Sequence, residues 1–89
     1  VLVCGSGQGV CMTANKIPGV RAGIVRGSDD AEMIRRHNDA SIACFGEQAT
    51  DPATAVTALA VFLTTDFDGG RHARRVEQMA EIERAEVKR

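Results

Sequence analysis

The first sixteen residues, VLVCGSGQGVCMTANK, place a cysteine directly before a run of glycines. A short apolar segment ends at Cys4, and Gly5, Gly7 and Gly9 follow at every second position. This order is typical of a buried strand that turns tightly into a helix, because glycine accepts backbone conformations that other residues avoid. The free N–H groups of such a turn form an anion site, and a thiol beside them can lose its proton near neutral pH. Cys4 is therefore a candidate base or nucleophile.

Two further polar clusters lie at the ends of predicted helices. The segment RRHND (residues 35–39) closes the second predicted helix, and GGRHARR (residues 69–75) opens the last one. Arginine binds phosphate through a two-pronged guanidinium group. A basic first turn also opposes the helix dipole, which favours an anionic partner at residues 71–75.

Each of these features also has a purely structural interpretation. Cys4 could be a buried, inert cysteine, and the glycines could serve packing alone. His37 could complement the dipole at a helix C-terminus, and the arginines could form a solvated helix face. Cys11, Met12 and Cys44 are predicted core residues. The residue types alone thus indicate a small α/β domain that binds an anionic metabolite.

Composition restricts the class of protein. The chain has 89 residues, of which 44% are hydrophobic and 26% charged, so we predict a single globular domain over residues 1–89. A net charge of −1 and an aromatic content of 3% argue against a nucleic-acid partner. No apolar run approaches the length of a membrane span. Three cysteines without a CxxC pair predict reduced thiols and a cytoplasmic location.

Strand and helix patterns alternate along the chain. We predict strands at Val1–Cys4, Arg21–Arg26 and Ser41–Phe45, and helices at Val10–Lys16, from Asp29 to Asn38-Asp39, at Ala53–Thr64 and at Arg71–Arg89. Ser28 is the expected N-cap of the second helix, and Thr50 or Asp51 that of the third, with Pro52 at its first position. The expected buried face of the third helix contains Val56, Leu59, Ala60, Val61, Phe62 and Leu63. The order predicts an α/β fold with a parallel sheet between helices.

The chain begins inside a predicted strand, without an initiator methionine. We therefore expect an N-terminal portion to precede Val1, and one edge of the first strand to be exposed in its absence.

The motifs CGSGQGVCMTANKIPGVRA, RRHNDASIACFG and FDGGRHARRV together resemble those of the type B ribose-5-phosphate isomerases, the group that includes the galactose-6-phosphate isomerase subunits. The resemblance covers essentially the whole chain, with the motifs in the family's order and spacing. It implies a Rossmann-like α/β/α fold and a homodimer or tetramer that uses no metal or organic cofactor. It also implies a small sugar phosphate as ligand, with interconversion of ribose 5-phosphate and ribulose 5-phosphate as the activity.

The resemblance also implies a role for individual residues. Moving a proton between C1 and C2 of a sugar phosphate requires a base, a group that stabilises an enediolate, and a phosphate site. Cys4 matches the base of one subgroup, whereas the glutamate that serves as base in another subgroup is Val10 here. The backbone N–H groups of Gly5 to Gly9 would stabilise the enediolate, and Ser6 and His37 match positions associated with ring opening. The remaining matched positions are Asn38 for the sugar hydroxyls, Asn15 for bracing the loop, and Arg71 and Arg75 for the phosphate, with His72 beside them.

Two departures from the family pattern leave alternatives open. The family's first strand, which ends in an Asp-His pair that contacts substrate, and its second strand are missing from this chain. Gln48 stands where the family commonly has a phosphate-binding arginine. The alternatives are an isomerase of a six-carbon sugar phosphate, such as allose or galactose 6-phosphate, and a noncatalytic module that binds phosphate sugars.

Overall fold

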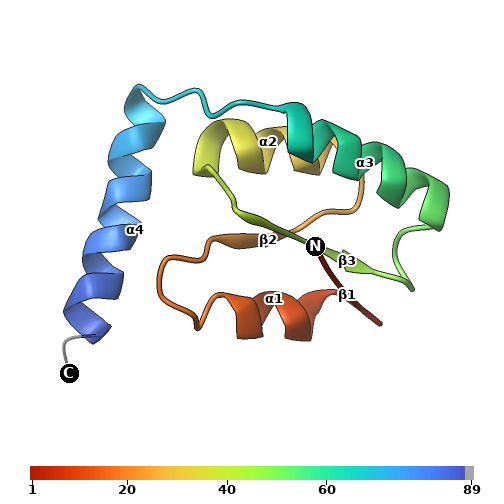
Figure 1. Ribbon diagram of the computed structural model, residues 1–89, viewed down its shortest axis with the longest axis horizontal. Helices are drawn as coiled ribbons and strands as arrows, with labels where there is room; N and C mark the ends of the chain where they lie inside the picture. The colour runs from red at the N-terminus through yellow and green to blue at the C-terminus, as the bar shows by residue number, and fades with distance from the viewer. Residues whose placement is uncertain (88–89) are drawn as a thin grey trace.

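The computed structural model of the chain describes residues 1–87. Strands and helices alternate as the sequence predicts until the last two helices, which follow one another (Figure 1). The elements are β1 (Leu2–Cys4), α1 (Gln8–Ala14), β2 (Ala22–Ile24), α2 (Ser28–Asn38), β3 (Ile42–Gly46), α3 (Pro52–Thr64) and α4 (Arg71–Val87).

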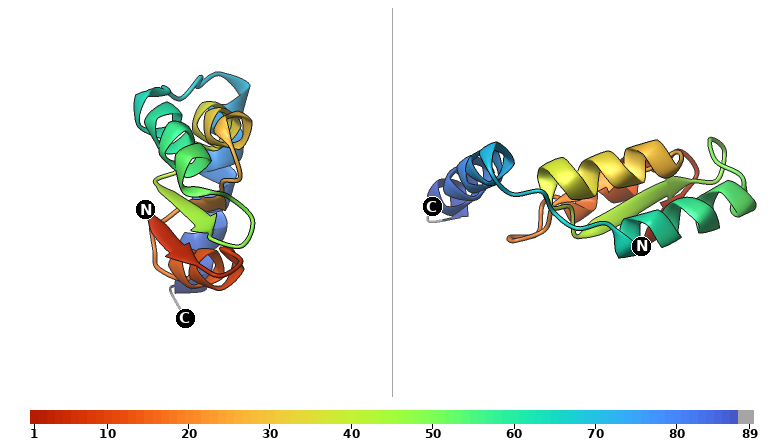
Figure 2. Two further views of the ribbon diagram at one scale, coloured as in Figure 1. Left: turned by 90° about the vertical axis from the view of Figure 1, so that its right-hand side faces the viewer. Right: turned by 90° about the horizontal axis from the view of Figure 1, so that it is seen from above.

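The three strands form a parallel sheet in the order β1-β3-β2, so β3 is the central strand. Leu2 pairs with Cys44 and Cys4 with Gly46, while Ala22 pairs with Ile42 on the other side of β3. The chain passes over β3 from β1 to β2 and then returns, and since both crossovers prefer the same hand, α1 and α2 lie on opposite faces. Helix α1 covers one face and α2 with α3 the other (Figures 1 and 2). The predicted Rossmann-like three-layer α/β/α class is thus confirmed.

The hydrophobic core lies between β3 and the pair of helices α2 and α3. Ala43 and Phe45 of β3 point to this side, because side chains alternate along a strand. They pack with buried small residues of both helices and with Phe62, whose ring also lies 5.5 Å from the guanidinium carbon of Arg35. Cys44 lies between Ala43 and Phe45, so its side chain points to the α1 side, and it is fully buried as predicted.

The predicted N-cap of α3 is confirmed, and that of α2 was wrong. The carboxylate of Asp51 accepts a hydrogen bond of 2.9 Å from the N–H of Thr54, with Pro52 next to it, which confirms Asp51 as the N-cap of α3. Hydrogen bonding by the Thr54 side chain first, and by this N–H second, lowers the pKa of Asp51. The expectation that Ser28 caps α2 was wrong, since Gly27 is the cap and Ser28 is already helical. Asp30 instead accepts a hydrogen bond of 3.0 Å from the N–H of Arg26 and holds this turn.

Other boundaries shift by a few residues. Helix α1 begins at Gln8 because Gly7 adopts a left-handed φ of 82° and turns the chain at once. Strand β2 is shorter than predicted, and β3 ends one residue later, at Gly46. Helix α4 begins at Arg71 as predicted; the predicted extension to Arg89 lies outside the described residues.

The predicted buried face of α3 was partly wrong. Phe62 is buried, and Leu59 and Val61 are partly buried, but Ala60, Val56 (69% exposed) and Leu63 (72% exposed) are not. The helix is apolar on almost every side, so periodicity cannot select the side that meets the sheet.

Met12, which we expected in the core, is 63% exposed on the outer side of α1. Cys11 is partly buried, with its Sγ 3.5 Å from the carbonyl oxygen of Ala22, and Ala14 is the buried residue of this helix.

The outer edge of β1 is open, as expected. In the described part of the chain β1 pairs only with β3. An apolar groove runs between this edge and α3, and its lining includes Val1, Val3, Phe45, Val56 and Leu59.

Within residues 1–87 no helix is both long and apolar enough to cross a membrane.

The difference between Phe62 and Leu63 provides a test of how α3 packs. We expect Phe62→Ala to lower the free energy of unfolding by about 3–5 kcal/mol, because it empties a buried site. The neighbouring exposed Leu63→Ala should change it by less than about 0.5 kcal/mol. Urea denaturation followed by circular dichroism measures both, and equal losses would show that the opposite side of α3 is packed.

Candidate active site

Cys4 and the five residues after it form a tight turn, which we call the thiol turn (residues 4–9). Strand β1 ends at Cys4, and Gly7 redirects the chain into α1. The N–H of Gly7 lies 3.2 Å from the Sγ of Cys4 and donates to it. The hydroxyl of Ser6 accepts from the N–H of Gln8 at 3.2 Å. The turn therefore directs backbone donors at the sulfur.

These donors stabilise the thiolate form of Cys4. The N–H of Val10 has the largest effect in lowering the pKa of this thiol, and those of Gly7, Ser6 and Gly9 add to it. Partial burial opposes them, but the net direction is downward from 9.0. A partly exposed thiolate held this way can accept a proton from a bound molecule near neutral pH.

The end of β3 and the residues after it support the thiol turn from the other side. The N–H of Glu47 donates to the carbonyl of Cys4, and that of Gln48 to the carbonyl of Gly5, both at 3.0 Å. The Gln48 side chain also lies against Gly5, with its amide nitrogen 3.5 Å from where a Cβ of residue 5 would be. These contacts tie the turn to the central strand.

Gly46 is a site residue that our sequence analysis did not identify. A Cβ at this position would lie 2.5 Å from both the carbonyl carbon and the oxygen of Ser6, which is too close for any side chain. Gly46 thus lets the Ser6–Gly7 peptide pack directly on β3. The only signal in the sequence is a glycine at a strand end, and that signal does not say which segment approaches it.

A second group of polar side chains lies where α2 ends and α4 begins. His37 of α2 and His72 of α4 stack with their ring centroids 4.2 Å apart, at an interplanar angle of 13°. One ligand atom from each histidine and from Asp68 lie within 4.8 Å of one another. We call these three residues the histidine cluster. Partial burial lowers the pKa of His72, as do His37 and Arg71 nearby, and these effects disfavour the charged form of this imidazole.

Asp68 holds this group together, although our sequence analysis gave it no role. Its N–H donates to the carbonyl of Arg36 at 3.0 Å, and its carboxylate receives the Nε of Arg36 at 3.2 Å from each oxygen. These bonds fasten the segment before α4 to the end of α2. The exposed side chains of Asn38, Arg71 and Arg75 belong to the same two helix ends.

Asn15 belongs to neither group. Its side chain donates to the carbonyl of Ala22 at 2.9 Å and accepts from the N–H of the same residue at 2.8 Å. It therefore ties the end of α1 to the start of β2.

The thiol turn and the histidine cluster lie at opposite ends of the sheet. Cys4 pairs with Gly46 at the carboxyl end of β3, whereas α2 ends just before Ile42 begins that strand. Four residues at about 3.3 Å each separate the two ends of β3 by about 13 Å. One chain therefore does not bring Cys4 and Ser6 together with His37 and the residues around it.

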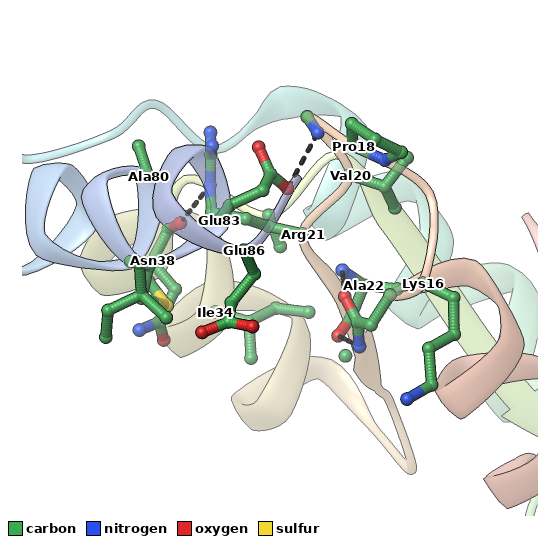
Figure 3. A pocket seen from close by; sticks show the side chains of 16 residues that line it. Lys16, Pro18, Val20, Arg21, Ala22, Ile34, Asn38, Ala80, Glu83 and Glu86 are labelled. Carbon is green, nitrogen blue, oxygen red and sulfur yellow. Dashed lines mark hydrogen bonds between the residues drawn. The ribbon is translucent and has the colours of Figure 1, made fainter. Parts of the chain in front are cut away.

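A groove of about 560 Å³ lies between α4 and the loop after α1 (Figure 3). Glu83 spans it and accepts a hydrogen bond of 2.8 Å from the N–H of Gly19. Among the predicted site residues only Asn15 and Asn38 line it. The groove is thus separate from both the thiol turn and the histidine cluster.

Residues 1–79 match the family model described as Ribose/Galactose Isomerase. The chain belongs to this family. Membership confirms the resemblance drawn from the three sequence motifs.

Individual members of the ribose/galactose isomerase family give the extent of the similarity. Ribose-5-P isomerase B of Listeria innocua is 43% identical over 83 residues, which are 93% of this chain and 56% of that protein. The solved ribose-5-phosphate isomerase B of Clostridium thermocellum is 42% identical, with a TM-score of 0.90, over 93% of this chain and 56% of that one. That of Mycoplasma genitalium with bound ribulose-5-phosphate is 36% identical, with a TM-score of 0.91, over 93% and 55%. The chain thus spans about half the length of the relatives it matches.

The N–H groups around Cys4 predict an unusual thiol reactivity. We expect iodoacetamide to alkylate Cys4 with a pH midpoint below 9.0, because the alkylated species is the thiolate. Cys44 should stay unmodified in the same samples, since burial first and the nearby Cys11 second raise its pKa to about 11. Peptide mass spectrometry across a pH series measures both, and a Cys4 midpoint at or above 9.0 would contradict the geometry.

Gly46→Ala tests whether the close approach of β3 shapes the thiol turn. The added Cβ must push the Ser6–Gly7 peptide away, so we expect the alkylation midpoint of Cys4 to rise toward 9.0. Gly27→Ala is the matched control, because a Cβ there meets nothing within 4 Å. An unchanged midpoint in a folded Gly46→Ala protein would show that the turn does not depend on this contact.

Proposed function

We propose that this chain provides the base and the phosphate-binding groups of an isomerase that interconverts ribose 5-phosphate and ribulose 5-phosphate. The observation that carries the proposal is the Cys4 thiol at the end of β1, with the N–H of Gly7 at 3.2 Å from its sulfur. Relatives named ribose-5-phosphate isomerase, one of them solved with ribulose-5-phosphate, support the substrate.

In this proposal Cys4 moves one proton between two neighbouring carbons. The thiolate removes the proton from C2 of the open-chain aldose, and the electron pair forms a C1–C2 double bond while charge develops on O1. The backbone N–H groups of Gly5 to Gly9 stabilise that oxygen. A proton passes from O2 to O1, and the thiol then returns its proton to C1, which gives the ketose.

The other predicted residues act before and around this step. Ser6 and His37 assist the opening of the sugar ring, and Asn38 contacts the sugar hydroxyls. Arg71 and Arg75 hold the phosphate with His72 beside them, because their exposed guanidinium groups share one turn of α4 with that imidazole. Asn15 braces the loop after α1.

We further propose that two copies share each site, in a homodimer or in a tetramer built from such dimers. The thiol turn and the histidine cluster lie at opposite ends of β3, about 13 Å apart along the strand. A base must lie within hydrogen-bond reach of the proton it removes, so one sugar phosphate needs both groups close together. A second copy, related by a two-fold axis, can bring its histidine cluster to the first copy's Cys4.

The free cysteines support a cytoplasmic location.

Mixing two inactive variants tests the shared site. In the complete protein, Cys4→Ala and His37→Ala should each abolish isomerisation of ribose 5-phosphate. After the two are unfolded and refolded together, we expect about a quarter of the wild-type activity, because half of the dimers are mixed and each has one intact site. Refolding each variant alone is the control. If the mixture stays inactive, sites are not shared, and if Cys4→Ala stays active, Cys4 is not the base.

Gln48, whose neutral amide lies beside Gly5, stands where the family commonly has a phosphate-binding arginine. Two alternatives are therefore tested as well. One is a six-carbon sugar phosphate as substrate, which a higher kcat/KM for allose or galactose 6-phosphate than for ribose 5-phosphate would support. The other is a noncatalytic module, which calorimetric binding of these phosphates by the complete protein without any turnover would support.

A further inference from the structure

The histidine cluster has the composition of a transition-metal site. Its three side chains come from different parts of the chain: the end of α2, the segment before α4, and the first turn of α4. One ligand atom of each lies within 4.8 Å of the other two. His37 and His72 are the two histidines of this sequence, and both belong to the cluster.

From this juxtaposition we propose that the histidine cluster binds a divalent transition-metal ion through His37, Asp68 and His72. Two imidazoles and one carboxylate suit nickel, copper or zinc, whereas magnesium and calcium prefer oxygen ligands alone. Three protein ligands leave coordination positions for water or for an added anion.

The rings must move for the metal to bind. They are stacked nearly parallel, and the lone pairs of imidazole nitrogen lie in the ring planes, so these lone pairs do not converge on one point. Both imidazoles are only partly buried and Asp68 is exposed, so a ring can turn without disturbing the core. Metal binding therefore breaks the stack.

The carboxylate of Asp68 remains available to a metal. Each of its oxygens accepts one bond from Arg36, and a carboxylate oxygen has a second lone pair. Arg36 also forms an ion pair of 3.2 Å with Glu32, which offsets part of its charge. The guanidinium groups of Arg71 and Arg75 add positive charge on α4 and reduce the affinity for a cation.

The metal has no part in the proposed isomerisation. It occupies the imidazoles that would meet the sugar phosphate, so metal and sugar phosphate compete. This competition rests on the proposed function, whereas metal binding itself does not.

Calorimetric titration of the protein with nickel chloride, in a buffer without phosphate and after alkylation of accessible thiols, tests the site. We expect one nickel ion per chain and an affinity at least about tenfold weaker in Asp68→Asn and in His72→Gln, because even outer-shell partners of a metal cost tenfold or more. Asp66→Asn, an exposed carboxylate two residues away, is the matched control and should bind as the unmodified protein does. Circular dichroism establishes that each variant is folded.

Equal affinities in Asp68→Asn and Asp66→Asn would overturn the site, as would binding that disappears once the thiols are alkylated. Since Asp68→Asn also removes the ion pair with Arg36, His72→Gln gives an independent result. Addition of ribose 5-phosphate to protein whose thiols are not alkylated, with nickel binding by the sugar phosphate alone measured and subtracted, separates the two proposals. A higher apparent Kd for nickel supports both, whereas nickel binding without competition leaves the metal site standing and contradicts the proposed role of the cluster.

Discussion

The positions of the thiol turn, the histidine cluster and the core all depend on the pairing of β3 with both other strands. Because β3 is central and parallel to its neighbours, the carboxyl ends of all three strands lie at one end of the sheet and the amino ends at the other. The thiol turn must therefore lie at one end, and the helix terminus that carries His37 at the other. The same strand supplies Ala43 and Phe45 to the core and places Gly46 beneath the turn.

The two polar groups of the chain are stabilised in different ways. Around Cys4 the stabilising groups are backbone N–H donors, whose positions follow from the path of the main chain. In the histidine cluster the contacts are between side chains: His37 stacks on His72, and Arg36 forms an ion pair with Asp68. The first group thus depends on strand pairing, and the second on how α4 is attached.

Local signals were enough to predict the order of elements and some of their limits. Pro52 after Asp51 determined where α3 starts, and Gly7 after a strand marked the turn, because both act through their own backbone. Features that depend on distant contacts were not predictable in this way. The buried side of α3, the clearance required at Gly46 and the role of Asp68 each involve partners far away in the sequence. The family motifs indicated the candidate residues. They did not indicate that these residues form two groups at opposite ends of the sheet.

The open edge of β1 links folding to concentration. Within residues 1–87 no strand pairs with its outer side, which lies beside the apolar groove that includes Val3, Val56 and Leu59. Any strand that pairs there binds the folded chain and not the unfolded one, and so shifts the folding equilibrium by mass action. Where that strand belongs to a separate molecule, the midpoint of thermal unfolding rises with the concentration of that molecule.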